Sequence, residues 1–259
     1  MQKVLGSIRK AVQTYDLIEN GDHIALAVSG GKDSLVMLQG LREFQRFAGI
    51  EYKLTALTID PCFNGEAGDY SAVKKLCDKL GIPYVIEKTD IAAIVFDIRK
   101  EKNPCSLCAK MRRGALHEKA KELGCNKLAL GHNNDDAVET FIMNLFRVGQ
   151  IDCFAPKSYL TRRDLTVIRP LCLAPEAQVR MAAKHAGLDI VKSKCPVDTH
   201  TKREETKEWL RSMEKQDKGF TIRLFGAMHR ADINGWGFPE DKENKRKKWR
   251  KHLDGYSQS

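Results

Sequence analysis

The 259-residue sequence lacks any apolar run long enough to cross a membrane as a helix, which argues against an integral helical membrane protein. Its first residues lack the apolar core of a secretory signal peptide, and we therefore expect a cytoplasmic protein. No internal repeat is present. The eight cysteines include a single Cys-x-x-Cys pair, and a disulfide framework is not expected in a cytosolic chain. Close cysteines are therefore interpreted as metal-binding or catalytic groups.

Two common phosphate-binding loops are also absent from the stretch of residues 24–38. A Walker loop requires glycine five residues before Gly31, where Leu26 stands, and serine or threonine where Asp33 stands. The dinucleotide fingerprint requires a third glycine close by, but the next one is Gly40. These departures exclude the usual forms of both motifs.

What the stretch does contain is an apolar run, a Ser-Gly-Gly turn and a helical pattern with Leu35, Leu38 and Leu41 on one face. A turn between a strand and a helix start exposes backbone N–H groups, and the helix dipole favours an anion there. The alternative is a glycine turn with a chance lysine. We expect a phosphate site formed by Ser29, Gly30, Gly31, Lys32, Asp33 and Ser34.

Strand and helix patterns alternate through most of the chain, which predicts a doubly wound, Rossmann-like parallel sheet with a helical C-terminal extension. Strands are expected at 24–28, 53–59, 82–86, 127–130 and 188–191, and a basic hairpin at 157–168. Helices are expected at 3–19, after the glycine turn, at 69–80 with Asp69 as its cap, at 106–123, after Asp136, from 175 to before Gly187, and near 203–216 and 221–230. The predicted division is an N-terminal helix (1–20), a nucleotide domain (21–195), C-terminal helices (196–239) and a basic, disordered tail (240–259).

Three polar turns follow three of the predicted strands. They are the Ser29–Ser34 turn, Asp60 and the Gly131–Asp136 turn. Ligands of open parallel sheets bind outside the carboxyl ends of the strands. We therefore expect the three turns to meet at one edge and to form the active site.

Cys105 and Cys108 form the Cys-x-x-Cys pair at the start of a predicted helix, where the helix dipole and the following Arg112 and Arg113 favour thiolates. The pair fits a redox site, half of a zinc site completed by Cys195 and a histidine such as His200, or part of an iron–sulfur site. Four other cysteines, which stand in no motif, are interpreted as packing residues: Cys77, Cys125, Cys153 and Cys172.

The formal charge of +10 and the basic run within residues 241–252 favour a polyanionic partner such as nucleic acid. A merely soluble basic protein is the alternative. The tail is expected to add nonspecific RNA affinity.

The ordered set of motifs resembles the TtcA family of tRNA 2-thiocytidine synthetases, which belong to the PP-loop ATP pyrophosphatases. The resemblance covers roughly residues 20 to 230, and the absence of a second Cys-x-x-Cys separates the chain from thiouridine synthetases with terminal zinc fingers. It is carried by Ser29-Gly30-Gly31-Lys32-Asp33-Ser34, Cys105-x-x-Cys108-x-x-x-Arg112-Arg113-Gly114, Leu130-Gly131-His132-x-x-Asp135-Asp136-x-x-Glu139-Thr140, Arg169-Pro170-Leu171, Cys195-Pro196 and Phe225-Gly226-Ala227-Met228.

The resemblance implies a cytoplasmic enzyme, a homodimer as in related enzymes, that uses ATP and Mg²⁺ to adenylate the C2 carbonyl of a tRNA pyrimidine, with cytidine 32 as target. Sulfur then replaces the oxygen, supplied by a cysteine desulfurase or by sulfide. The resemblance also implies a [4Fe–4S] cluster held by Cys105, Cys108 and Cys195. Some members have a second cysteine near the last of these, where this sequence reads Pro-Val-Asp.

The implied site residues each have a structural alternative. Asp33 binds magnesium or caps its helix, and Asp60 borders the nucleotide or closes a strand. Gly131, His132 and Asp135 line the site, or the last two cap a helix. Arg112 neutralises phosphate charge or is surface charge. Cys62 is the other cysteine at the predicted active edge.

Other functions also fit parts of the sequence. A lysidine synthetase or an amide ligase would use the same phosphate loop without the cysteines. Thiolation of a tRNA uridine would retain the chemistry with another target. A zinc-binding RNA-binding protein without sulfur transfer would use the cysteines for structure alone.

Overall fold

The computed structural model describes residues 1–100, 104–191, 195 and 202–238. The predicted basic tail and His200 lie outside the described residues. The elements in chain order are α1 (Gln2–Tyr15), β1 (His23–Ala27), α2 (Lys32–Phe44), β2 (Lys53–Asp60), η1 (Phe63–Gly65), α3 (Ser71–Leu80), β3 (Tyr84–Lys88), η2 (Ala93–Ile98), α4 (Pro104–Glu122), β4 (Lys127–Ala129), α5 (Asn134–Met143), η3 (Asn144–Val148), β5 (Lys157–Leu160), β6 (Leu165–Ile168), α6 (Glu176–His185), α7 (Lys202–Gln216), α8 (Phe220–Ala231) and η4 (Ile233–Gly235).

The strands form a six-stranded sheet in the order β3-β2-β1-β4-β6-β5, parallel except for β5. β1 lies at the centre, where Ala25 pairs with Thr55 of β2 and with Leu128 of β4. The order steps outward from β1 in both directions, which places the switch point between β1 and β4. The predicted doubly wound fold is confirmed, and the antiparallel β5–β6 pair confirms the predicted hairpin.

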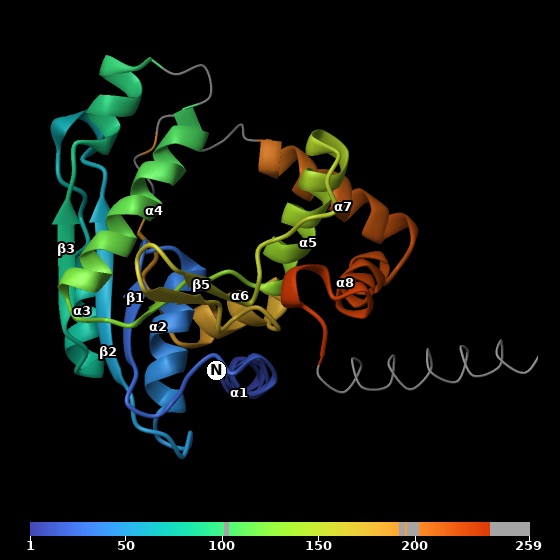
Figure 1. Cartoon of the computed structure of the whole chain (residues 1–259), viewed down its shortest axis with the longest axis horizontal. Coiled ribbons are helices and arrows are strands. Elements are labelled where there is room, and N and C mark those ends of the chain that lie inside the picture. The colour runs from blue at the N-terminus through green and yellow to red at the C-terminus, as the bar shows by residue number, and fades with distance from the viewer. Residues whose placement is uncertain (101–103, 192–194, 196–201, 239–259) are drawn as a thin grey trace, which may run out of the picture. The chain divides into compact units, whose positions relative to one another are not determined.

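Both faces of the central strand are buried, as a parallel sheet requires. Ala25 packs in a cluster with Ala120 of α4 and Leu128 of β4. Its neighbours Ile24 and Leu26 point to the opposite face and are also fully buried. α4 covers one face, and α2 contacts β1, α1 and α6 (Figure 1). This packing fixes the helix starts that follow β1 and β4.

Two sequence predictions of local structure are wrong. Residues 188–191 form no strand, and the N–H of Val191 instead donates one hydrogen bond to the Gly30 carbonyl, 3.0 Å away. The apolar Ile190-Val191 pair suggested a strand, but a single bond to a loop makes no ladder. α3 has Tyr70 at its N-cap, and Asp69 accepts a hydrogen bond from the N–H of Ser71 at 2.9 Å.

The chain divides into two compact units, each described here by itself. The first spans Met1–Asn134 and Lys157–Thr201 and contains the sheet. The second spans Asp135–Pro156 and Lys202–Ser259, and its described part is helical. Trp236 is fully buried in the second unit and donates its indole N–H to the Phe154 carbonyl at 2.7 Å. α7 and α8 confirm the two helices predicted near 203–216 and 221–230.

Within the described ranges, no helix combines the length and the apolar character needed to cross a bilayer.

Candidate nucleotide and cysteine site

The Ser-Gly-Gly turn links β1 to α2 and is closed by its own hydroxyl groups. The Ser34 hydroxyl donates to the Gly31 carbonyl at 2.8 Å and accepts from the backbone N–H of Ser29 at 3.2 Å. Gly30 has a φ of +83°, a left-handed conformation that glycine adopts without strain. α2 begins at Lys32 with Gly31 as its N-cap and no side-chain cap. Its first N–H groups are therefore left for an anion.

The turn after β4 lies directly against this loop. A Cβ on Gly131 would stand 3.1 Å from both the Asp33 carbonyl carbon and the Ser34 nitrogen. The buried Asn133 donates to the Asp33 carboxylate at 3.1 Å. Arg169 donates to Nδ1 of His132 at 3.3 Å. Two of the three polar turns therefore meet at one edge, and Asp33 contacts Asn133 rather than capping α2.

Lys32 is held between two carboxylates. Its Nζ lies 2.9 Å from Asp33 and 2.9 Å from Glu176, in the first turn of α6. Burial alone lowers the pKa of Lys32, but the hydrogen bonds to the two carboxylates outweigh it, and the pKa is raised. Sequence reasoning missed Glu176, whose only local signal is an acid following Pro175 at a helix start.

Asp60 ends β2 and organises the loop that follows. Its side chain is buried, and its carboxylate accepts from the N–H of Cys62 at 3.1 Å, the N–H of Gly68 at 2.8 Å and the Tyr70 hydroxyl at 3.5 Å. Burial, together with the Asp60 charge, raises the pKa of Tyr70 to about 12, so that the hydroxyl stays protonated. Asp60 therefore anchors the loop, whatever else it contacts.

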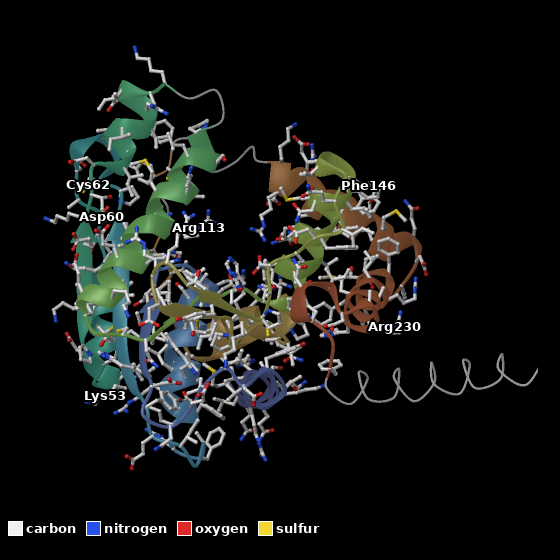
Figure 2. All side chains as sticks on the ribbon, in the orientation of Figure 1. Lys53, Asp60, Cys62, Arg113, Phe146 and Arg230 are labelled. Carbon is white, nitrogen blue, oxygen red and sulfur yellow. The ribbon has the colours of Figure 1, made fainter. Side chains whose placement is uncertain are left out.

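Cys62 follows Asp60 in a left-handed conformation, with a φ of +53°. Its half-buried thiol lies 3.8 Å from the Asp60 carbonyl. Figure 2 shows Asp60 and Cys62 together beyond the end of β2, with Arg113 on α4. Cys62 thus lies at the carboxyl end of β2, but it is not among the residues that line the pocket at this edge.

A pocket of about 550 Å³ opens at this edge, within the size range of small-molecule sites. Four of the predicted site residues line it: Ser29, Gly31, Asp60 and Arg112. The remaining lining comes from the loop after β2, the start of α3 and the Ile190-Val191 pair. The pocket thus contains the phosphate loop, an acid and a guanidinium group.

Val191 packs against the phosphate loop at Gly30. Its N–H donates to the Gly30 carbonyl, and its side chain leaves no room for a side chain at position 30, since a Cβ on Gly30 would lie 2.6 Å from the Val191 Cβ. No sequence pattern indicated this contact, because the two residues are far apart in the chain.

The Cys-x-x-Cys pair stands in the first turns of α4, as predicted. Cys105 is exposed, and Cys108 and Cys195 are half-buried. Burial raises the pKa of Cys108, the thiols of Cys195 and Cys105 raise it further, and Arg112 opposes the rise. The expected stabilisation of a thiolate at Cys108 is therefore wrong, because burial of Cys108 against the apolar cluster that includes Leu57 and Ile59 outweighs the local helix start.

Because Cys105 and Cys195 both affect the pKa of Cys108, the three cysteines lie near one another. Among the described residues, however, no three Cys, His, Asp or Glu side chains are arranged to hold a metal ion. The four cysteines expected to serve packing are all buried. Burial raises the pKa of Cys77 and of Cys125 to about 11, as expected for inert thiols.

Arg112 connects the pocket to the cysteines. It lines the pocket, and its charge acts on both Cys108 and Tyr70, lowering their pKa against the effect of burial. Arg112 therefore lies close to both the pocket and Cys108.

Asp135 and Asp136 stand in the first turn of α5, in the second unit, where acids favour the helix dipole. Arg203 of α7 binds Asp136 at 3.1 Å and the buried Glu139 at 3.0 Å. Burial raises the pKa of Glu139, and Arg203 opposes the shift. Asp136 and Glu139 thus join α5 to α7 through Arg203.

A PP-loop domain model matches residues 3–215. The chain is 37% identical over 218 residues to the tRNA-cytidine(32) 2-sulfurtransferase of Citrifermentans bemidjiense, covering 83% of this chain and 85% of that protein. It is 40% identical over 213 residues to the enzyme of the same name from Pelobacter propionicus, covering 81% and 78%.

Among solved structures, the U34-tRNA thiolase NcsA from Methanococcus maripaludis with its [4Fe-4S] cluster superposes with a TM-score of 0.70 at 28% identity, covering 87% of this chain and 77% of that one. The TM-score and the identity support relationship rather than fold alone. From the domain match and the curated relatives, the chain belongs to the PP-loop family and, within it, to the tRNA-cytidine(32) 2-sulfurtransferase (TtcA) family.

Proposed function

We propose that this protein is an ATP-dependent tRNA thiolase that replaces the C2 oxygen of cytidine 32 with sulfur. The observation that carries the proposal is Arg112, which lines the phosphate-loop pocket and also acts on Cys108. A site for ATP and a group of three cysteines in one unit suit activation of a carbonyl followed by sulfur transfer.

In the first step the C2 oxygen attacks the α-phosphorus of ATP, the α–β phosphoanhydride bond breaks, and pyrophosphate leaves. The free N–H groups at the start of α2 bind the phosphates. Lys32 supplies positive charge, and Arg112 stabilises charge developing on the phosphates. Asp33 contributes a carboxylate oxygen to Mg²⁺, the ligand type this cation prefers. The adenylated carbonyl then has AMP as its leaving group, and hydrosulfide displaces it to form 2-thiocytidine.

The cysteine set fits a [4Fe–4S] cluster in its chemistry. Cys105, Cys108 and Cys195 would hold it, because thiolates are the usual ligands of such clusters and both Cys105 and Cys195 act electrostatically on Cys108. When bound, such a cluster would supply sulfur, at the oxidation level of hydrosulfide, to the adenylated base. The three thiols would move closer together when the cluster binds, because metal binding is commonly coupled to local ordering.

Three further residues complete the proposed site. Cys62, held beside Asp60, faces the reacting base with its thiol. His132, oriented by Arg169, binds the base or the ribose. Gly131 provides the close approach that keeps its turn on the phosphate loop.

The partners follow from the reaction. The substrate is tRNA, and a cysteine desulfurase or free sulfide supplies sulfur in the cytoplasm. Homodimerisation is supported by large apolar side chains that the second unit exposes, including Phe146, Ile151 and Ile222.

A second candidate is thiolation of a tRNA uridine, favoured by the similarity to NcsA, whose name specifies U34. The two candidates share the chemistry and differ in the base that enters the site.

The test is mass spectrometry of tRNA nucleosides from cells with and without the gene, complemented by wild type, Cys105→Ala or Cys125→Ala. Loss of 2-thiocytidine, restored by wild type and by the packing-residue control Cys125→Ala but not by Cys105→Ala, supports the proposal. Loss of a thiouridine supports the second candidate. Unchanged thionucleosides contradict both, and zinc without iron in anaerobically prepared protein contradicts the cluster.

A further inference from the structure

The outer face of α4 meets the turn of the β5–β6 hairpin in a cluster of basic side chains. Arg113 and His117 stand one helical turn apart and share a face of α4. Arg162 and Arg163 are exposed in the hairpin turn. None of these side chains has a role in the proposed adenylation.

An ion pair holds the hairpin turn against the helix. Lys121 of α4 donates to the Asp164 carbonyl at 2.9 Å and to its carboxylate at 3.2 Å. The Tyr159 hydroxyl donates to the same carboxylate at 3.0 Å. The acid of the turn is therefore engaged by Lys121 and Tyr159 rather than by the neighbouring arginines.

The arginines of this surface lie close to one another. Burial lowers the pKa of His117, and the charges of Arg113 and Arg163 lower it further, so that both act on one imidazole. Across the described part of the chain, neither Arg113 nor Arg163 forms an ion pair. Two unpaired arginines beside a neutral histidine repel each other, and an anion bound between them would relieve that repulsion.

We propose that Arg113, His117 and Arg163, which we call the α4 stripe, bind the phosphate backbone of the substrate RNA along α4, from beside the nucleotide pocket toward the edge of the sheet where β6 begins. This inference rests on the proposed function and deepens it by naming a docking surface for tRNA. The arginines pair with phosphate oxygens, and the neutral His117 donates one ring N–H.

The position of the stripe matches that task. Arg113 directly follows Arg112, which lines the nucleotide pocket, and α4 begins with the proposed cluster ligands Cys105 and Cys108. At about 1.5 Å per residue, the stripe extends from about 7 Å to about 14 Å beyond Cys108 along the helix. A nucleic-acid strand carries a phosphate about every 3.4 Å of axis, so more than one phosphate fits over this length.

The test compares Arg163→Glu with Arg46→Glu in the full-length protein. Arg46 is also exposed, but it follows α2, which right-handed crossovers place on the opposite face of the sheet from α4. Binding of tRNA is measured by fluorescence anisotropy over a series of salt concentrations. For Arg163→Glu we expect tRNA affinity to fall by about tenfold or more at low salt, and the salt slope to fall by roughly 0.7 to 0.9 per lost phosphate contact. Arg46→Glu should bind tRNA as wild type does.

Two further variants separate binding from folding. Arg163→Lys keeps the charge and should recover most of the affinity, while Arg113→Glu should reproduce the loss. ATP affinity and thermal melting should be unchanged in Arg163→Glu, since Arg163 is not among the residues that line the pocket.

The proposal that the α4 stripe binds RNA would be overturned by either of two results. One is that Arg163→Glu keeps the tRNA affinity and salt slope of the wild type, and the other is that Arg46→Glu loses as much tRNA affinity as Arg163→Glu. Failure of the proposed function looks different. If the wild-type protein forms no thionucleoside yet tRNA binding depends on Arg163, the stripe stands and the thiolase proposal falls.

Discussion

The nucleotide pocket and the cysteine site lie in the same unit but are built differently. Backbone atoms shape the pocket, where Gly131 approaches the phosphate loop, Val191 bonds Gly30, and Asp60 anchors the loop after β2. The cysteines share electrostatic contact, but no three potential ligands among the described residues are arranged around a metal position. A site made of backbone is formed by folding itself, whereas a site made of side chains is completed when its ligand binds.

The largest effect that tests this difference is expected for Cys105→Ala. Loss of one of three proposed thiolates should lower bound iron and thiolation by at least about tenfold, because metal sites depend strongly on their ligand count. ATP affinity should change by less than about twofold, since folding alone forms the pocket. Iron analysis and calorimetry with ATP measure the two quantities. A parallel loss of ATP binding would show that the sites are not independent.

The reciprocal change is Gly30→Ala. The positive φ of Gly30 costs an L-residue about 1 to 2 kcal/mol, and the contact with Val191 adds about 1 to 3 kcal/mol. We expect ATP affinity to fall by about tenfold to a hundredfold, with bound iron retained. Gly124→Ala, also at positive φ but with nothing within 4 Å of its Cβ, is the matched control for conformational strain alone. Equal effects of the two substitutions would argue against the steric role of Val191.

A smaller effect is expected for Glu176→Gln, which frees Lys32 from one of its two carboxylates. The pocket gains one net positive charge, and ATP should bind about three- to tenfold more tightly at low salt, as for a charge pair near a protein surface. The exposed Glu51→Gln makes the same charge change at a distance and should leave ATP affinity unaltered. Weaker binding in Glu176→Gln would mean that the acid positions Lys32 instead of competing for it.

The smallest effect concerns pH and lies outside both sites. Because burial and two arginines lower the pKa of His117, the unfolded chain takes up a proton first as pH falls below about 6.5. The contribution of His117 to stability is therefore complete above that pH and is lost as pH falls toward its folded pKa. Urea unfolding of wild type and His117→Gln between pH 7.5 and 5 should show a shallower decline in the variant. Parallel curves would contradict the assignment.

These contrasts also explain which features the sequence could reveal. Residues 24–38 predicted β1, the glycine turn and α2 correctly, because apolar period and turn chemistry are local signals. The pairing of Lys32 with Glu176 and the bond from Val191 to Gly30 join segments far apart in the chain, and no local pattern specifies such partners. The pKa of Cys108 was misjudged for the same reason, since Cys108 packs against a buried cluster that includes Leu57 and Ile59 of β2, far away in the chain.

The hydrogen bond between Val191 and Gly30 also sets a length limit. Cys195 is four residues beyond Val191, and an extended chain covers at most about 3.5 Å per residue. Cys195, the third proposed ligand, is therefore at most about 14 Å along the chain from Val191, which is hydrogen-bonded to the phosphate loop. Covalent chain length alone therefore keeps the Cys195 Cα within about 14 Å of the Val191 Cα, and Val191 contacts Gly30 of the predicted phosphate loop.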